Sequence, residues 1–308
     1  MAYFLALDAG GTKTVAVMAD ETRELARRSC GSVKLMRVGE EEATQRLETL
    51  LQELSAAAGV PLDAISYTCM GLAGLSIEAV KRWAEQLLGR LVGGTVELCG
   101  DEEIALDGAF RGGPGILVIA GTGSNLVGRA VLDEGNQVLE AKYWVGGWGP
   151  ALGDEGSGYW IGQEAVRAGL WGRDRGVPSR LLEAVQEAWG VQSLGELVEA
   201  GNAQPGPDFA MLAPVVYQCA KEGDELATAV LERAGHELAE QVAVVRTKMA
   251  EAGDFGRVQV ACTGSVLEKI TPVRESMIAA LASMGVDVDV LPEPADAIAG
   301  ALWRARQA

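Results

Sequence analysis

Short apolar runs alternate with longer amphipathic stretches from the start of the chain to about residue 112. Two strand-like runs, 3–8 and 14–18, flank a glycine turn and predict a β-hairpin. Further on, apolar residues with helical spacing indicate two helices, and two continuous apolar runs indicate strands. In chain order, these later elements are a helix at 40–58, a strand at 65–72, a helix at 78–91 and a strand at 95–99.

The hairpin pattern returns at 115–120 and 126–131, so the chain contains two halves built on one plan. The breaker-rich stretch 111–115 is the expected linker between them. Helical spacing then dominates, with two more strands near the end. The predicted elements are helices at 159–170, 178–189, 209–221 and 224–251, a strand at 258–262, a helix at 272–284, a strand at 286–291 and a helix at 294–306. This alternation predicts an α/β fold with mixed sheets.

The composition excludes several classes of partner. The chain has 43 acidic and 26 basic residues, for a formal net charge of −17. Nucleic acids and anionic membrane surfaces both need a basic face, so neither is an expected partner. No apolar run approaches the length of a spanning helix, and the N-terminus lacks the basic region of a signal peptide. We therefore expect a cytoplasmic protein.

The cysteines and the single histidine suggest no metal centre. The five cysteines are widely spaced and form no C-x-x-C pair, so neither a zinc site nor a thiol-disulfide motif is indicated. Cys69, Cys99 and Cys262 lie in apolar runs and are expected to be reduced core residues. His236 falls within a predicted helix, where a lone histidine is most simply a surface residue. No G-x-S-x-G nucleophile elbow is present.

The turn of the first hairpin offers backbone N–H groups, hydroxyls and an ammonium in the sequence Asp8-Ala9-Gly10-Gly11-Thr12-Lys13-Thr14. Glycine lets the backbone approach phosphate oxygens closely, and exposed N–H groups bind anions. An ordinary structural turn has the same composition. The loop is not a Walker A loop, because G-x-x-x-x-G-K-[ST] is absent from the chain.

Two later turns repeat this chemistry. The second hairpin turns through Gly121-Thr122-Gly123-Ser124-Asn125, at the point equivalent to the first glycine loop. Two such loops at equivalent points are more specific for phosphate than either alone. Gly264 and Ser265 follow an apolar strand and precede a helix. They are interpreted either as an anion-binding helix N-terminus or as an ordinary turn with Ser265 as N-cap.

Asp101 follows the predicted strand 95–99 and the turn residue Gly100. One interpretation makes it the N-cap of a helix whose first turn carries further acids. The other interpretation makes it a general base at the end of a strand, facing a cleft. The residues alone leave both open.

The densest signal is the glycine-rich stretch 146–158, in which Trp148, Asp154 and Glu155 are interleaved with glycines. A loop of this composition is entropically costly to order, so its composition favours a binding function over a plain surface loop.

Together these motifs resemble those of the BadF/BadG/BcrA/BcrD ATPase family, which includes N-acetylglucosamine kinases within the actin-like sugar kinase superfamily. The resemblance spans almost the whole chain, and the run at 147–157 is highly specific to this group. It implies an α/β fold with two actin-like (ribonuclease H-like) domains, mixed sheets flanked by helices, and a cleft between the domains. The expected domains are 1–112 plus 294–308, and 113–293.

The resemblance also implies a reaction and its residues. The γ-phosphate of ATP would pass to a hydroxyl of an amino sugar, N-acetylglucosamine being the expected one. Asp101 would be the catalytic base, and Asp8 would hold Mg²⁺ through water. The residues expected to contact ATP are Gly10, Gly11, Thr12, Lys13, Thr122, Gly123, Ala210, Gly264 and Ser265. Those expected to contact the sugar are Asp101, Ser124, Asn125, Gly147, Trp148, Gly149, Asp154 and Lys34.

Other functions stay open at this point. The sugar could be glucosamine or N-acetylmuramic acid. The family also contains ATPase activators of acyl-CoA dehydratases, but their iron–sulfur cluster needs cysteines, and none lies between Cys99 and Cys219. A related sugar-sensing repressor would carry a DNA-binding segment before the first strand. A homodimer is the family expectation.

Lys34 departs from the family pattern. N-acetylglucosamine kinases of this family carry a sugar-contacting asparagine in the loop after the third strand, and here residues 30–37 contain none. Lys34 is the nearest equivalent by position. It is either a solvated loop residue or a cation that selects a sugar bearing a carboxylate, such as N-acetylmuramic acid.

Overall fold

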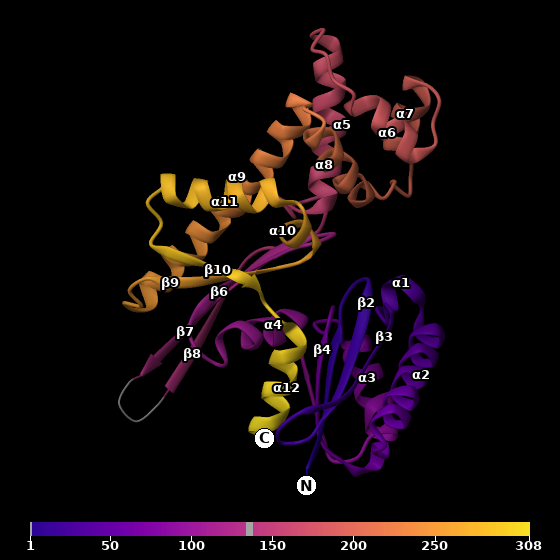
Figure 1. Ribbon diagram of the computed structural model, residues 1–308, viewed down its shortest axis with the longest axis vertical. Helices are drawn as coiled ribbons and strands as arrows, with labels where there is room; N and C mark the ends of the chain where they lie inside the picture. The colour runs from indigo at the N-terminus through magenta and orange to yellow at the C-terminus, as the bar shows by residue number, and fades with distance from the viewer. Residues whose placement is uncertain (1, 134–137) are drawn as a thin grey trace. The chain divides into compact units, whose positions relative to one another are not determined.

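The structure is a computed structural model that describes residues 2–133 and 138–308. The chain divides into two compact units (Figure 1). The first comprises Met1–Gly113 and Ala295–Ala308, and the second comprises Pro114–Pro294. Each unit contains one five-stranded sheet. Among the described residues, no helix combines the length and apolarity that crossing a membrane requires.

The sheet of the first unit has the strand order β3-β2-β1-β4-β5. Its strands are β1 (Tyr3–Ala9), β2 (Lys13–Ala19), β3 (Glu24–Gly31), β4 (Ile65–Leu72) and β5 (Thr95–Cys99). The first three strands are antiparallel neighbours, whereas β4 and β5 run parallel to β1. The apolar pattern located every strand except β3, for which it gave no bounds. Most side chains of this edge strand are exposed, so it carries no clear apolar run.

Helices cover both faces of this sheet. Successive side chains of β1 point to opposite faces and pack against different helices. Leu5 and Leu7 belong to a core shared with the predicted helices α2 (Glu40–Ala58) and α3 (Glu78–Leu91). Ala6 points to the other face, which packs against Ile104 of α4 and against the final helix. The helices of this face are α4 (Asp101–Phe110) and α12 (Ala297–Gln307).

The sheet of the second unit has the order β10-β9-β6-β7-β8. Its strands are β6 (Gly115–Ala120), β7 (Ser124–Asp133), β8 (Val138–Gly146), β9 (Val258–Thr263) and β10 (Val288–Pro294). The two hairpin pairings are antiparallel, and β9 runs parallel to both β6 and β10. The strand β8 was not predicted.

The long helix α9 (Glu225–Ala252) and α11 (Thr271–Ser283) lie on one face of this sheet (Figure 1), and α9 supplies more buried core residues than any other helix of the unit. The described part of the unit also contains the helices α5 (Gly158–Asp174), α6 (Leu181–Trp189), α7 (Leu194–Gly201), α8 (Ala213–Lys221) and α10 (Ser265–Lys269). A smaller core joins α5, α6 and α7 to the 3₁₀ turn Phe209–Leu212. The predicted fold class, α/β with mixed sheets flanked by helices, is confirmed.

Several predicted elements need correction. The last helix does not start at Pro294, which ends β10; it starts at Ala297, with the Asp296 carboxylate accepting the N–H of Ala299 at 3.0 Å. The predicted helix at 209–221 opens as the 3₁₀ turn before becoming α8. His236 is exposed on α9, as predicted.

Two short helices were not predicted from the sequence, whereas the predicted burial of three cysteines is confirmed. The short helices α7 and α1 (Leu35–Val38) were missed, because each is too short to show an apolar period. The three cysteines expected in the core are buried, with exposed fractions of 0% for Cys69, 3% for Cys99 and 4% for Cys262.

Candidate active site

In the first unit, the strand register brings the two predicted carboxylates to one edge of the sheet. Asp8 of β1 pairs with Gly71 of β4, and Gly71 pairs with Cys99 of β5. Because these strands are parallel, Asp8 and the turn into Asp101 lie at the same carboxyl ends. Gly71 lets α4 pack closely here, since a Cβ atom on it would lie 2.2 Å from Cδ1 of Ile104. Both carboxylates thus belong to one end of one sheet.

Asp101 is not the N-cap of α4. Gly100 occupies that position and Asp101 is the first helical residue, followed by two more acids in the first turn. A Cβ atom on Gly100 would lie 2.5 Å from the carboxylate oxygens of Glu102, so this side chain folds back over the turn. The side chains of Asp101 and Glu102 share a hydrogen bond. The capping interpretation is therefore wrong in detail, and the carboxylate of Asp101 is left for another role.

The carboxyl groups at this edge have raised pKa values. Burial, followed by the Asp296 carboxylate, raises the pKa of Asp8 to about 6, and the Lys13 ammonium opposes the rise. Burial also raises the pKa of Asp101, with Asp8 adding to the rise and the hydrogen bond from Glu102 opposing it. Burial raises the pKa of Glu102 to about 7. Clustered, partly desolvated carboxylates attract a cation, and Mg²⁺ typically binds one or two carboxylates while keeping waters. Among the described residues, no group of three or more potential ligands is placed to hold a metal ion, so Mg²⁺ at this edge would be bound by one or two carboxylates and by waters.

The first glycine loop is held by the segment that follows β3. Gly10 donates its N–H to the Lys13 carbonyl at 3.1 Å, closing the turn. The Ser32 hydroxyl donates to the Gly10 carbonyl at 3.2 Å, and the Arg37 guanidinium donates to the Gly11 carbonyl at 2.9 Å. With its carbonyls tied back in this way, the loop exposes Gly11, Thr12 and Lys13. Exposed loop N–H groups and an ammonium are suited to bind phosphate.

Lys34 lies beside this loop. Its backbone N–H donates to the Ser32 hydroxyl at 3.1 Å, the same hydroxyl that donates to Gly10. Lys34 is also the residue from which the short helix α1 starts, and its side chain is half-buried. Its backbone is thus attached to the glycine loop through Ser32.

In the second unit, the residues predicted to border the nucleotide come together at the ends of β6 and β9. A Cβ atom on Gly121 would lie 4.0 Å from both the backbone nitrogen and the hydroxyl of Ser265. Gly158, at the start of α5, donates its N–H to the Gly121 carbonyl at 2.8 Å and would place a Cβ atom 3.6 Å from the Ala210 carbonyl. The Tyr159 N–H donates to the Thr122 carbonyl at 3.1 Å.

Gly264 is the cap of α10, so Ser265 is the first helical residue instead of the N-cap. The Gly264 N–H donates to the Glu268 carboxylate at 2.9 Å. The backbone of Gly264 has a φ of 99°, which favours glycine. The conformation brings this turn directly against the second glycine loop.

The glycine-rich stretch places its aspartate beside the same loop. A Cβ atom on Gly123 would lie 2.8 Å from Oδ2 of Asp154, so the loop needs glycine at this point. Asp154 is only 7% exposed and has a left-handed backbone with a φ of 61°. Its Oδ1 accepts the Gly149 N–H at 3.1 Å. The carboxylate is thus fixed in position, with one oxygen facing the loop.

The remaining predicted sugar contacts differ in exposure. Trp148 is 75% exposed, and Gly147 lies against Asn125, whose Cβ would be 2.9 Å from a Cβ on this glycine. Ser124 is only 4% exposed and donates its hydroxyl to the Glu155 carbonyl at 2.8 Å. Its role in the structure is therefore to hold the glycine-rich loop.

The structure thus gathers the predicted residues into two sets. The set in the first unit contains Asp8, Gly10, Gly11, Thr12, Lys13, Lys34 and Asp101. The set in the second unit contains Thr122, Gly123, Ser124, Asn125, Gly147, Trp148, Gly149, Asp154, Ala210, Gly264 and Ser265. Sequence reasoning missed the roles of four residues that contact these sets, which are Ser32, Arg37, Glu102 and Gln241. It also missed Asp296, whose carboxylate acts on Asp8 through its charge. Only Glu102, adjacent to Asp101, carried a local signal.

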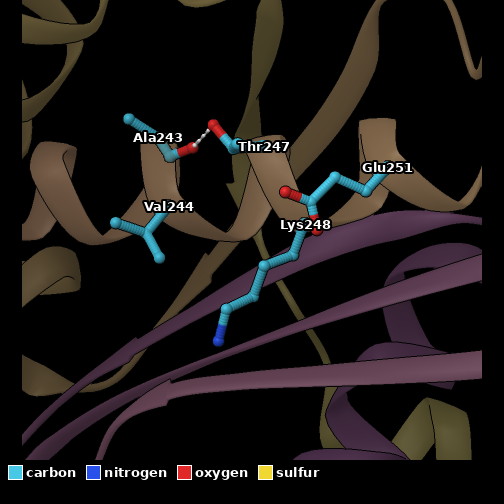
Figure 2. Close-up of a pocket in the computed structure, with 5 residues that line it drawn as sticks. All are labelled: Ala243, Val244, Thr247, Lys248 and Glu251. Atoms are coloured by element: carbon cyan, nitrogen blue, oxygen red, sulfur yellow. Dashed lines mark hydrogen bonds between the residues drawn. The ribbon is translucent and has the colours of Figure 1, made fainter.

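A surface groove of about 380 Å³ runs along α9 (Figure 2). It is lined by Ala243, Val244, Thr247, Lys248 and Glu251. The Thr247 hydroxyl bonds to the Ala243 carbonyl within the helix, at 2.9 Å. None of the predicted site residues lines this groove.

Comparison with known proteins gives consistent results. The model of the BadF/BadG/BcrA/BcrD ATPase family matches residues 5–303. An N-acetylmuramic acid/N-acetylglucosamine kinase from Clostridium acetobutylicum is 31% identical over 77% of this chain and 77% of its own length. An N-acetyl-D-glucosamine kinase from Dictyostelium discoideum is 27% identical over 80% of both chains. The crystal structure of a candidate N-acetylglucosamine kinase from Chromobacterium violaceum superposes with a TM-score of 0.72, at 28% identity, over 98% of both chains.

Proposed function

Because this chain belongs to the BadF/BadG/BcrA/BcrD ATPase family, we propose that it is an ATP-dependent kinase of an amino sugar. The γ-phosphate of ATP would be transferred to a sugar hydroxyl. One observation carries the proposal: Oδ2 of Asp154 lies 2.8 Å from the Cβ position of Gly123. The carboxylate proposed to bind sugar hydroxyls therefore lies against the loop proposed to bind phosphate, within a single unit.

Asp101 is the proposed base. It would accept the proton of the attacking hydroxyl as the oxygen bonds to the γ-phosphorus and the bond to the β-phosphate oxygen breaks. Its position supports this role, because the first turn of α4 fixes it and the N-cap is left to Gly100. A base with a raised pKa has a stronger tendency to take a proton than an ordinary aspartate.

The glycine loops are the proposed phosphate sites. The N–H groups and side chains of Gly10, Gly11, Thr12 and Lys13 would bind phosphate oxygens, as would Thr122 and Gly123. Ala210, Gly264 and Ser265 would border the nucleotide. Asp8 would hold Mg²⁺, which supplies neutralisation of the phosphate charge.

N-acetylglucosamine is the proposed substrate, with N-acetylmuramic acid as the second candidate. The proposed sugar contacts, besides Asp101 and Lys34, are Ser124, Asn125, Gly147, Trp148, Gly149 and Asp154. The second candidate is favoured by Lys34, whose ammonium belongs to a segment attached to the first glycine loop. A relative of this chain is described as acting on both sugars. We also propose a cytoplasmic homodimer, on the family resemblance alone.

The decisive experiment measures ADP release with Mg²⁺ and ATP across N-acetylglucosamine, glucosamine and N-acetylmuramic acid, with mass analysis of the products. We expect sugar-dependent ADP release and a product heavier than its sugar by one phosphoryl group. ADP release that no sugar stimulates would contradict the proposal and would favour the ATPase-activator alternative.

A further inference from the structure

Helix α9 reaches the glycine-rich loop through one polar side chain, that of Gln241. Its Nε2 lies 3.4 Å from two carbonyl oxygens, that of Glu155 in the loop and that of Glu237 one turn earlier in the helix. Its Oε1 lies 2.4 Å from the position of a Cβ atom on Gly146, at the end of β8. Gln241 therefore contacts the loop near both its ends.

The orientation of this amide is determined by its neighbours. Two carbonyl oxygens can face only the NH₂ group, because the opposite assignment would place the amide oxygen against them. The oxygen must then face Gly146, where any side chain would displace it. This oxygen is buried and has no hydrogen-bond donor among the described residues, as is also true of Oδ1 of the proposed sugar contact Asn125. Asn125 pairs with Gly146 across β7 and β8.

The Glu155 carbonyl in the loop accepts two side-chain hydrogen bonds. It accepts the Ser124 hydroxyl from β7 at 2.8 Å in addition to the amide from α9. The preceding residue is Asp154, whose left-handed backbone (φ 61°) is strained for a residue other than glycine. Such a conformation persists only where the surroundings hold it. The Ser124 hydroxyl and the Gln241 amide, which both donate to the Glu155 carbonyl, are placed to hold the Asp154 backbone in this conformation.

We propose that Gln241 is a positioning residue, which holds Asp154 in its substrate-binding conformation by donating to the Glu155 carbonyl. The role in sugar binding rests on the proposed function, whereas the effect on the loop does not. Gln241 itself would touch neither ATP nor the reacting hydroxyl. Its effect would be on the affinity for the sugar, transmitted through one peptide group.

Two substitutions separate the hydrogen bond from the packing. Gln241→Met keeps the length of the side chain and removes the amide, and Gln241→Glu keeps the shape and the oxygen but removes the donor at neutral pH. Thr247→Val is the matched control, because it removes a hydrogen bond within the same helix (Figure 2), and that bond is made to Ala243 instead of to the loop. All four proteins are first compared by thermal unfolding.

The first measurement is hydrogen–deuterium exchange of the substrate-free protein, followed by mass spectrometry of peptides covering 146–157. We expect both Gln241 variants to exchange about three- to tenfold faster there, the range expected for the loss of one hydrogen bond, with Thr247→Val unchanged. Wild-type exchange in both Gln241 variants would overturn the proposal. So would equally faster exchange in Thr247→Val, which would show a general loosening of α9.

The second measurement is steady-state kinetics with whichever sugar the enzyme phosphorylates. We expect a KM for the sugar about three- to tenfold higher in both Gln241 variants, with the KM for ATP within twofold of wild type. Ser124→Ala combined with Gln241→Met should be non-additive, because both donors act on one carbonyl. Equal rises in the two KM values, or strict additivity, would contradict a positioning role even if the protein is a sugar kinase.

Discussion

The carbonyl oxygen of Ala120 lies 2.4 Å from the position that a Cβ atom would take on Gly264. Gly264 also has a φ of 99°, so the turn before α10 excludes a side chain for two separate reasons. We predict that Gly264→Ala destabilises the protein by about 2–4 kcal/mol and weakens ATP binding, because the turn must shift away from the second glycine loop. Urea unfolding and calorimetric titration with ATP measure the two effects.

Gly256→Ala is the control for this substitution. Gly256 has a φ of 56° but open space around its Cβ position, so alanine there has only the backbone strain. We expect a loss of about 1 kcal/mol and unchanged ATP affinity. Equal losses of stability in the two variants would show that the close approach to Ala120 has no energetic consequence.

The carboxylate of Asp101 is predicted to be needed for the transfer step and not for ATP binding. Asp101→Asn keeps the shape of the side chain but cannot accept the proton, so turnover should fall on the order of 10²–10⁴-fold. The ATP dissociation constant should stay within about twofold, because no role in ATP binding is proposed for this carboxylate. The measurements are kcat from ADP release and titration with a non-hydrolysable ATP analogue.

Asp63→Asn is the matched control, since Asp63 is exposed in the same unit and is expected to have wild-type turnover. Near-wild-type turnover in Asp101→Asn would assign the base to another group. Glu102, which shares a hydrogen bond with Asp101, would then be the first group to test.

The elements that the sequence predicted well are those in which buried apolar side chains recur at a regular spacing along the chain. The strands β1 and β6 and the helices α2 and α9 have clear apolar periods, and their bounds differ from the predicted ones by a few residues at most. By contrast, β3 is an edge strand whose side chains are mostly exposed, so it leaves a weak apolar pattern. The other missed strand, β8, is also an edge strand, and it mixes charged with apolar residues. Pro294 was misplaced because proline is tolerated both at the first turn of a helix and at the edge of a sheet.

The candidate site also has parts that the sequence predicted and parts that it did not. Glycine loops and the glycine-rich stretch were visible in the sequence, because glycine at close approaches leaves a local pattern. The side chains that hold these loops were not visible. Arg37 reaches Gly11 across 26 residues, and Gln241 reaches Glu155 across 86. Contacts of this kind depend on the fold, and a single sequence carries no signal for them.

Asp20 is predicted to stabilise the first unit in a pH-dependent way. The backbone N–H groups of Thr22 and Arg23, each 2.7–2.8 Å from its Oδ1, lower the pKa of this carboxyl to about 2. An acid whose pKa is lowered by folding stabilises the folded state above its unfolded value, near 4. That contribution is lost as the pH falls through 2. Asp20→Asn should therefore lower the free energy of unfolding at pH 6–8.

The difference from wild type should shrink steadily between pH 4 and pH 2, where the wild-type carboxyl becomes protonated. Urea unfolding at each pH measures it, with Asp63→Asn as the exposed control. A difference that stays constant from pH 7 to pH 2 would mean that charge has no part in the effect of Asp20.

Lys34 gives the most specific prediction about the substrate. Its backbone N–H donates to the Ser32 hydroxyl, and that hydroxyl donates to the Gly10 carbonyl, so the segment that carries Lys34 is tied to the proposed phosphate loop. An ammonium facing a carboxylate in a partly closed site contributes about 1–3 kcal/mol, which is enough to change the preferred sugar. We predict that the wild type phosphorylates N-acetylmuramic acid with a higher kcat/KM than Lys34→Asn does. The same substitution should preserve or raise kcat/KM for N-acetylglucosamine.

Lys81→Asn, on an exposed face of α3, is the control for loss of charge. If Lys34→Asn leaves the ratio of the two kcat/KM values unchanged, Lys34 has no part in selecting the sugar, and its contact with Ser32 serves only to hold the loop.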